Sequence, residues 1–484
     1  MIGWINKIGA SRFAWRRRRN IRVSQPSPTQ TDVPPSGLIP SELGEWYFAR
    51  ATQASEQGRP IEALEHFQNA VHHAPGRWEF HRYLAMELLQ GFGELDAAVN
   101  AFRKARRIRR NLARREIAMR KPIRYMDHFW TMQIGHNANM EPYIKREIML
   151  GRSPHDTILY VAPGHRIANP CLLDHFSKFV TLVRDEAVLP FPRQQMELFH
   201  EDYFLLEYPY GQEVHWWHAG AAIIQRWEEE ERPPLLSLSA AEEQRGGAAL
   251  KCLGVPDGAW FVCLHVRESG FKSSHHSVQD SLNADIGTYR RAIKAIVERG
   301  GWVIRMGDPS MTRLSKVSGV IDYAHSAFKV DWLDVYLSAK CRFFVGVSSG
   351  LAYVPPLFGV PCVLTNWLPT GTRPWHESGI YIPKLYRLGG KRLARFDEIF
   401  SPPLGWALKY AHAEQDKIEI IDNKPEEIEA VVLEMIDRLD GRFEATANDE
   451  ALQTRYDRMA SASRCLGRAR VGRDFLLAYQ DLLK

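Results

Sequence analysis

Three stretches of the sequence decide the fold: WFVCLHVRESG (Trp260–Gly270), GGWVIRMGD (Gly300–Asp308) and CRFFVGVSSG (Cys341–Gly350). Each is a short apolar run that ends in a small cluster of polar residues and glycine, and helix-like stretches lie between them. This pattern is typical of parallel strands alternating with helices, which place polar side chains and a ligand site at the carboxyl ends of the strands. The sequence therefore predicts an α/β domain around these three runs.

The alternation continues on both sides of the three runs. In the second half of the chain, from about Asp257 to Asp422, we expect strands over residues 260–266, 302–306, 319–322, 343–347 and 362–365, and helices over 289–299 and 331–339. In the first half, from about Lys121, we expect strands over 157–162 and 178–183 and a helix over 217–234. Such repeated alternation predicts parallel sheets with helices on both faces.

A helical hairpin precedes the α/β halves, over residues 44–75. It places residues at the positions that a tetratricopeptide repeat favours, namely Trp46, Ala49, Gly58, Ala63, Phe67, Ala70 and Pro75. The small residues allow two helices to approach closely, and Pro75 ends the second one. A weaker second copy follows over residues 78–105, so the region resembles the tetratricopeptide family.

The chain has 484 residues, of which 45% are hydrophobic and 25% charged, and this composition indicates a globular protein of two or three domains. No run approaches the ~18 apolar residues of a membrane-spanning helix. We expect no secretory signal, because the basic cluster follows the apolar residues of the start. Six scattered cysteines without a CxxC pair predict buried free thiols in a reducing compartment and no zinc site.

The formal net charge of +6 is concentrated in two blocks, Arg16–Arg19 and residues 104–121. Either block is a solvated surface or a site for nucleic acid or anionic lipid, but no nucleic-acid-binding motif accompanies them. The first block follows an apolar face formed by Ile2, Trp4, Ile5 and Ile8. This tail is therefore either disordered or a weak anchor at a membrane surface, and a proline-rich linker to Pro40 follows it.

Two residues at the end of the first apolar run are candidates for ligand binding. The forked guanidinium of Arg267 can hold a diphosphate and neutralise a leaving group. The alternative for Arg267 is a structural ion pair, because a buried arginine without an anionic partner is costly. His265 shares a face with Arg267 in a straight strand, and it is either a ligand contact or a core histidine.

The ends of the next two expected strands carry further candidates. Arg305 suits a phosphate, Gly307 allows the backbone to approach a ligand closely, and Asp308 suits a ribose or base. The alternative is an ordinary turn between a strand and a helix. Asp322 and Tyr323 end a short strand, where a base is often recognised in such folds.

The turn Ser348-Ser349-Gly350 predicts an anion cradle at a helix N-terminus, or else simple capping. Asp334 is either part of a nucleotide site or a cap of the helix it begins, and Asp285 is either a loop residue of the site or an N-cap. The pair His275-His276 has no carboxylate or cysteine at ligand spacing, so we expect no metal there.

At this point the sequence resembles a group of bacterial glycosyltransferases, some of which carry tetratricopeptide repeats. The motifs that carry the resemblance are HVRESGF, GGWVIRMGD, IDYA, SAKCRFFVGVSSG and IGHNANMEPYIKREIMLG. The similarity covers about Asp127–Lys384, including the turn Gly135-His136. It implies a GT-B-like fold of two doubly wound parallel-sheet domains behind a small helical region.

More distantly, HVR and the paired serines resemble the GDP-fucose-dependent fucosyltransferases. That resemblance implies diphosphate binding by Arg267, a donor contact by His265, and a nucleotide site at Asp334, Ser348 and Ser349. The sequence departs from the fucosyltransferases directly after HVR, where it reads Glu268-Ser269-Gly270, and the donor sugar therefore stays open.

The resemblance implies a metal-independent glycosyltransferase that moves a sugar from a nucleotide-diphosphate donor, its only co-substrate, to a glycan, lipid-linked or protein hydroxyl. Arg267 would stabilise the leaving group, and Glu268, Asp285 and His136 are candidates for the general base. The rival hypotheses are a non-catalytic nucleotide-sugar-binding scaffold and a sugar-nucleotide epimerase. We expect a cytoplasmic protein, either free or peripheral at the inner membrane surface, with the repeats available to a protein partner.

These expectations divide the chain into five segments. They are a basic tail and linker (1–40), helical repeats (41–120), an acceptor-side α/β domain (121–245), a donor-side α/β domain (246–440) and C-terminal helices (441–484).

Overall fold

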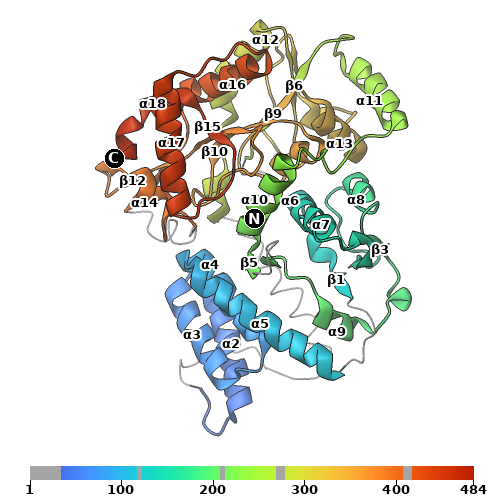
Figure 1. Cartoon of the computed structure of the whole chain (residues 1–484), viewed down its shortest axis with the longest axis vertical. Coiled ribbons are helices and arrows are strands. Elements are labelled where there is room, and N and C mark those ends of the chain that lie inside the picture. The colour runs from blue at the N-terminus through green and yellow to red at the C-terminus, as the bar shows by residue number, and fades with distance from the viewer. Residues whose placement is uncertain (1–33, 117–122, 208–212, 269–277, 407–416) are drawn as a thin grey trace. The chain divides into compact units, whose positions relative to one another are not determined.

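The computed structural model describes residues 34–116, 123–207, 213–268, 278–406 and 417–484 (Figure 1). The predicted tail with Arg16–Arg19, the basic residues Arg120 and Lys121, and the pair His275-His276 lie outside the described residues. The chain divides into two compact units. Unit 1 comprises residues 1–119, 277–279 and 402–415, and unit 2 comprises residues 120–276, 280–401 and 416–484.

Unit 1 consists largely of helices, as the sequence predicts. They are α2 (Pro40–Glu56), α3 (Pro60–His73), α4 (Trp78–Phe92) and α5 (Leu95–Glu116). Phe48, Phe67 and Phe80 form the core, with the Phe48 and Phe80 rings stacked at 4.7 Å. Ala63 and Ala70 are fully buried between the helices, which is the close approach expected of small residues. The tetratricopeptide assignment stays a prediction.

Some basic side chains of α5 contact aromatic rings, and others are exposed to solvent. The Arg109 guanidinium lies over the Trp78 ring at 5.2 Å. Lys104, Arg107 and Arg114 are exposed along the helix. Part of the charge therefore covers aromatic surface within unit 1. In the described ranges, no helix has an apolar stretch long enough to cross a membrane.

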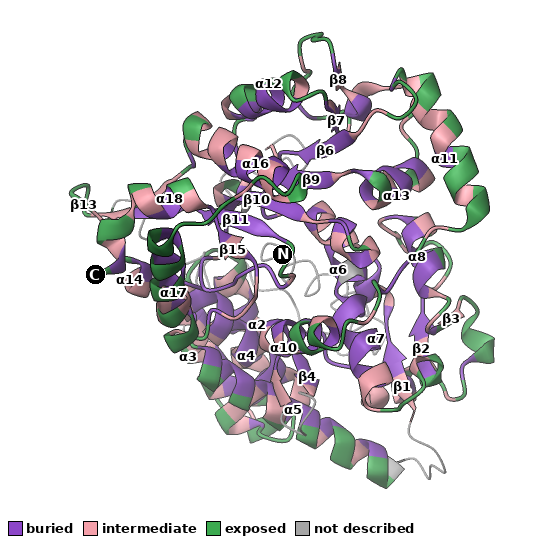
Figure 2. Ribbon diagram, turned by 45° about the horizontal axis from the view of Figure 1, so that its top comes forward, coloured by how far each residue is buried: buried purple, intermediate pink, exposed green. Residues whose placement is uncertain are grey.

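The second half of unit 2 is built on a sheet of seven strands in which every pair is parallel (Figure 1). The strands are β6 (Phe261–His265), β7 (Trp302–Arg305), β8 (Val320–Ile321), β9 (Phe343–Gly346), β10 (Cys362–Trp367), β11 (Ile380–Pro383) and β15 (Arg470–Val471). Figure 2 shows β6, β9 and β10 as buried, because helices cover both faces of such a sheet. The predicted parallel sheet is confirmed.

Contacts from β10 show how its two faces are covered. Cys362 and Thr365 lie three residues apart, so their side chains point to opposite faces. The Thr365 hydroxyl lies 2.6 Å from the hydroxyl of Tyr289, which directly precedes α12 (Arg290–Glu298). The Cys362 thiol donates to the Ala352 carbonyl oxygen on the other face. From β6, the Cys263 thiol meets the Leu337 carbonyl of α13 (Asp331–Lys340) at 3.4 Å.

The strand order β15-β11-β10-β9-β6-β7-β8 contains a topological switch point. The chain runs outward from β6 through β7 to β8, and then returns to place β9 on the other side of β6. The connections on the two sides of this point lie on opposite faces of such a sheet. In open α/β sheets, ligands bind at the carboxyl ends of the strands that flank such a point, which here are β6 and β9.

The first half of unit 2 contains a smaller parallel sheet, with β1 (Arg124–Met126), β2 (Thr157–Tyr160) and β3 (Thr181–Val183) in sequence order. Its helices are α6 (Ile134–Ala138), α7 (Met140–Met149), α8 (Pro170–Phe176) and α10 (Trp216–Glu229). In α7, buried Glu147 binds Arg124 of β1 at 3.0 Å and Arg146 at 2.7 Å. The α/β class with parallel sheets is as predicted, but the three described strands of the first sheet lie in sequence order and are not doubly wound. The GT-B-like arrangement stays a prediction.

The remaining elements surround the two sheets. They are α9 (Arg193–Met196), β4 (Leu205–Glu207), β5 (Glu213–His215), α11 (Ala240–Leu253), β12 (Leu385–Leu388), β13 (Arg392–Leu393), α14 (Phe396–Phe400), β14 (Ile418–Ile421), α16 (Pro425–Leu439), α17 (Ala447–Ala462) and α18 (Arg473–Ala478). The strands β13, β12 and β14 form an antiparallel sheet. An aromatic cluster joins α10 to the second half, with the Trp217 ring 4.8 Å from Trp375 and 6.1 Å from Tyr353.

Candidate functional site

A hydrogen bond spans the switch point of the seven-stranded sheet. His265 is the last residue of β6, and it lies opposite Gly346, the last residue of β9. Three residues beyond Gly346, the Ser349 hydroxyl lies 3.1 Å from Nδ1 of His265. Burial, followed by the nearby charges of Arg305 and Arg267, lowers the pKa of His265 to about 4. His265 and Ser349 therefore form a neutral hydrogen-bonding pair at physiological pH.

Arg267 follows this pair two residues later on the same chain segment. It is partly buried, and its carbonyl oxygen accepts the Ala284 N–H at 3.0 Å, which fixes the backbone beyond the strand. Burial lowers the pKa of the Arg267 guanidinium, whereas the charge of Asp280 raises it. Arginine remains a cation under such conditions. A positive charge is thus held just beyond the carboxyl end of β6 with only part of its hydration.

Arg305 belongs to an interior ion-pair network. Its side chain is fully buried, 3.2 Å from Asp322 and 3.5 Å from Glu268. Glu268 also accepts the Thr312 N–H at 2.6 Å. This arrangement neutralises Arg305 and ties the segments after β6, β7 and β8 together. The roles of Arg305 and Asp322 in donor binding and of Glu268 as a base stay predictions.

A second group of contacts surrounds Asp322 and the turn after β7. Asp322 accepts the Leu314 N–H at 3.0 Å and pairs with Nδ1 of His325 at 2.9 Å. Gly307 has a φ of +141°, and a Cβ there would lie 2.2 Å from the sulfur of Met311. Asp308 accepts the Ser310 N–H at 2.9 Å. The Met311 side chain occupies the space beside Gly307 where a larger residue would place its Cβ.

Asp334 lies in the first turn of α13 and forms an ion pair with Lys329. Burial raises the pKa of Asp334, and Lys329 acts in the opposite direction. The buried Tyr323 donates its hydroxyl hydrogen to the Val330 carbonyl at 3.2 Å. Lys329 is near enough to His265 to help lower the pKa of that imidazole. Sequence reasoning missed Lys329, although a lysine five residues before Asp334 was a usable signal.

The serine turn leads into a helix, as the sequence predicts, and that helix is a short 3₁₀ helix. Ser348 accepts the Leu368 N–H at 2.7 Å, and Ser349 precedes a 3₁₀ helix of only four residues, Gly350–Tyr353. Pro355 and Pro356 follow directly and prevent a longer α-helix. The anion cradle at this helix N-terminus stays a prediction. The binding roles of Ser348, Ser349 and Gly350 stay predictions.

Two other candidate bases have partners of their own. His136 is buried, with Nδ1 2.7 Å from the Phe129 carbonyl oxygen and its ring stacked on Tyr203 at 4.8 Å. Asp285 accepts the Gly287 N–H at 2.7 Å and caps the 3₁₀ helix Ile286–Tyr289. The N-cap interpretation of Asp285 is thus confirmed. The role of His136 in catalysis stays a prediction.

Two contacts join the first and second halves of unit 2. In α6, which follows β1, Gly135 packs against Gly350, and a Cβ on Gly350 would lie 2.6 Å from the Gly135 nitrogen. After β2, the side-chain amide of Asn169 donates to the Asp331 carbonyl oxygen at 2.9 Å. Both contacts join a segment beyond a strand of the first sheet to a segment beyond a strand of the second.

His376 of the second half forms a third contact with the first half of unit 2, because it lies between α7 and α10. Its Nδ1 lies 3.0 Å from Glu228 of α10, and its Nε2 lies 3.4 Å from Glu141 of α7, which also binds Lys145. Burial acts to lower the pKa of His376, but Glu141 and the hydrogen bond to Glu228 outweigh it and raise the pKa to about 9. His376 is therefore an imidazolium at neutral pH.

The ion pairs of His376 with Glu228 and Glu141 predict that the stability of the fold depends on pH. The pKa of His376 is higher in the folded chain than the value near 6.5 of an unfolded histidine. The stabilisation is thus complete below about pH 6.5 and is lost as the pH rises through about 9. We expect the melting temperature of the wild type to fall more steeply over this interval than that of His376→Asn. Parallel melting curves from pH 6 to 10 would contradict this assignment.

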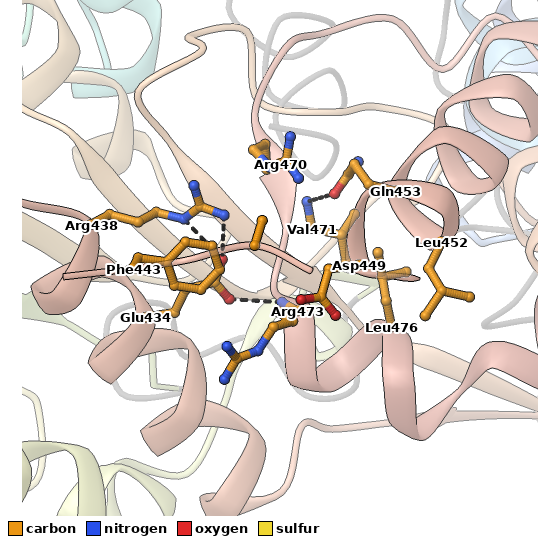
Figure 3. A pocket seen from close by; sticks show the side chains of 11 residues that line it. Glu434, Arg438, Phe443, Asp449, Leu452, Gln453, Arg470, Val471, Arg473 and Leu476 are labelled. Carbon is orange, nitrogen blue, oxygen red and sulfur yellow. Dashed lines mark hydrogen bonds and ion pairs between the residues drawn. The ribbon is translucent and has the colours of Figure 1, made fainter. Parts of the chain in front are cut away.

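A small polar recess lies apart from the switch point, beside the edge strand β15 (Figure 3). Arg438 binds Glu434 at 2.9 Å and lies over the Phe443 ring at 3.8 Å. Arg470 binds Glu450 at 2.7 Å. Because carboxylates neutralise these arginines, the recess is not assigned a ligand. Among the described residues, no group of three or more histidines, cysteines and carboxylates is placed to hold a metal ion.

The sequence matches no protein-family model, and a search of curated proteins finds no match. Among solved structures, a glycosyltransferase of family 9 from Veillonella parvula has a TM-score of 0.35 at 9% identity, covering 55% of this chain and 87% of its own. The iron-containing dodecameric glycosyltransferase TibC from enterotoxigenic E. coli has a TM-score of 0.31 at 16% identity, covering 54% and 61%. A variant of the Thermobaculum terrenum O-GlcNAc transferase has a TM-score of 0.21 at 11% identity, covering 91% and 90%. Likenesses this low assign no activity, donor or acceptor to this chain.

Proposed function

We propose that the protein transfers a sugar from a nucleoside-diphosphate donor to an acceptor hydroxyl. The observation that carries the proposal is the His265–Ser349 hydrogen bond across the switch point of the parallel sheet, with Arg267 two residues further on. This is the place where open α/β sheets bind nucleotides. The site offers what a sugar diphosphate needs, namely a cation and neutral hydrogen-bonding groups.

The roles of the residues follow from charge. When the bond between the sugar and the diphosphate breaks, negative charge develops on the phosphate oxygen. Arg267 stabilises that charge through its forked guanidinium. His265 is neutral and hydrogen-bonded, so it contacts the donor without adding charge. In this proposal the Arg267 cation does the work that a metal ion would do elsewhere.

The donor sugar and the acceptor can be judged only from the sequence motifs. The HVR motif and the paired serines resemble the fucosyltransferases, but Glu268 binds Arg305 and the Thr312 N–H directly after HVR. The proposal therefore commits to a nucleotide sugar and leaves the sugar open. The acceptor is the hydroxyl of a glycan, a lipid-linked glycan or a protein.

The test is a donor screen followed by a transfer assay. Purified full-length protein is melted in the presence of GDP-, UDP-, CMP- and dTDP-sugars. A ligand at 100 times its Kd stabilises the folded state by about 2.7 kcal/mol, which raises the melting temperature measurably. The stabilising donor, carrying a labelled sugar, is then incubated with a mixture of acceptors.

The outcomes separate the proposal from its rivals. Transfer of label to an acceptor supports it. Stabilisation without transfer or hydrolysis indicates a binding scaffold, and interconversion of the free donor without an acceptor indicates an epimerase. Absence of stabilisation by every nucleotide sugar would overturn the proposal.

A further inference from the structure

Two histidines meet at the carboxyl edge of the first sheet, where the donor site described above does not use them. His128 begins the 3₁₀ helix His128–Trp130 after β1, and His165 lies in the segment after β2. Their ring centroids are 4.1 Å apart, with the ring planes inclined by 44°. Both residues are partly exposed. Two imidazoles thus lie next to each other and remain accessible from solvent.

The hydrogen bond of His165 defines its tautomer. Its Nδ1 lies 3.2 Å from the Ala162 carbonyl oxygen, which can only accept. Nδ1 therefore carries the hydrogen, and in the neutral ring the lone pair is on Nε2. The segment itself is held by a hydrogen bond from the Ala168 N–H to the Thr131 carbonyl oxygen at 2.9 Å. His165 thus presents a basic nitrogen from a fixed backbone.

Contacts on both sides of the histidine pair reach the donor half of unit 2. Four residues after His165, Asn169 binds the Asp331 carbonyl oxygen at the start of α13. On the His128 side, Gly135 packs against Gly350, which adjoins the Ser349 that binds His265. The histidine pair is therefore carried by the two segments of the first half that meet the carboxyl edge of the donor sheet.

The carboxylates that were candidates for the base are already occupied. Glu268 binds Arg305 and the Thr312 N–H, and Asp285 caps a 3₁₀ helix. A displacement at the anomeric carbon nevertheless needs a group that takes the acceptor proton. Within the described residues, His165 combines a lone pair on Nε2, partial exposure and a segment whose Asn169 contacts the donor half.

We propose that His165 is the general base of the transfer reaction and that His128 is a positioning residue which holds its ring. The inference rests on the proposed function. Nε2 of His165 takes the proton of the acceptor hydroxyl while the acceptor oxygen forms its bond to the anomeric carbon. The bond from that carbon to the diphosphate oxygen breaks, and its electron pair leaves with the nucleoside diphosphate. One displacement of this kind inverts the anomeric configuration.

The experiment compares variants of the full chain with the donor that the screen identifies. A general base contributes about 100- to 10,000-fold to the rate, so we expect His165→Asn to lower kcat at least about 100-fold. Donor affinity measured by calorimetry should be unchanged, which also shows that the variant is folded. The matched control is His155→Asn, because His155 is exposed in the short helix Pro154–Asp156, just before the other end of β2. This control should retain wild-type kcat.

Two further measurements separate catalysis from structure. Added imidazole should restore part of the rate of His165→Gly, because free imidazole can occupy the vacated space, and it should not accelerate the wild type. NMR of the product should show an inverted anomeric centre. Wild-type kcat in His165→Asn, loss of donor binding in that variant, or a retained anomeric centre would overturn the inference while the proposed function stands. No transfer by the wild type would overturn both.

Discussion

Replacing Arg267 with alanine is expected to weaken the binding of the nucleoside diphosphate by at least about 30-fold. The guanidinium is partly removed from water, and charge-assisted contacts to a diphosphate are strong there. Loss of one partner of such a contact costs about 2 to 5 kcal/mol, and each 1.4 kcal/mol is about tenfold in affinity. Calorimetry with the nucleoside diphosphate alone measures this loss without any need for an acceptor.

The melting temperature should change little in Arg267→Ala, since the side chain is only partly buried. Arg267→Lys keeps the charge but loses the fork, and we expect an intermediate affinity. The matched control is Arg290→Ala, because Arg290 is exposed at the start of α12 in the same half. Wild-type affinity in Arg267→Ala would remove Arg267 from the donor site.

Replacing Gly350 with alanine is expected to lower kcat/KM at least about 100-fold. The new Cβ would lie 2.6 Å from the Gly135 nitrogen and 2.9 Å from Cγ2 of Ile134. Backbone cannot move aside as a flexible side chain can, so the two segments would separate locally. A displacement of about 1 Å at reacting groups costs on the order of 100-fold in rate. We also expect a loss of about 1 to 3 kcal/mol of stability from the overpacking.

Gly247→Ala is the matched control for Gly350→Ala. Gly247 lies in α11 with no atom near the position of its missing Cβ, so alanine there should be neutral or slightly stabilising. Melting curves and transfer assays of the two variants measure both effects. If Gly350→Ala retains wild-type kcat/KM and melting temperature, the contact between Gly135 and Gly350 is not part of the working enzyme.

Much of the fold could be predicted because its signals are local. Apolar runs such as FVCLH (Phe261–His265) and FFVG (Phe343–Gly346) can be recognised from their own residues, and both are buried strands close to the expected positions. The N-cap at Asp285 was equally local, since its partner is the Gly287 N–H two residues away. The serine turn was harder, because Pro355 and Pro356 limit the expected helix to four residues.

The candidate site was less predictable because its partners are distant in the sequence. Arg305 looked like a ligand for phosphate at the end of its strand, yet Glu268 and Asp322 neutralise it in the fold. Lys329 pairs with Asp334 and influences the pKa of His265 only in the folded chain. No local pattern specifies such neighbours, since they depend on how the strands are ordered.

The sequence by itself determined that strands and helices alternate and that each strand ends in polar residues, because hydrophobic periodicity and turn residues act over a few positions. Only the tertiary structure decided that β9 lies beside β6, that Ser349 reaches His265 across 84 residues of sequence, and that Gly350 packs on Gly135. The physical reason is that strand order results from packing the whole sheet between its helices. The site is therefore formed by residues whose proximity is a property of the completed fold.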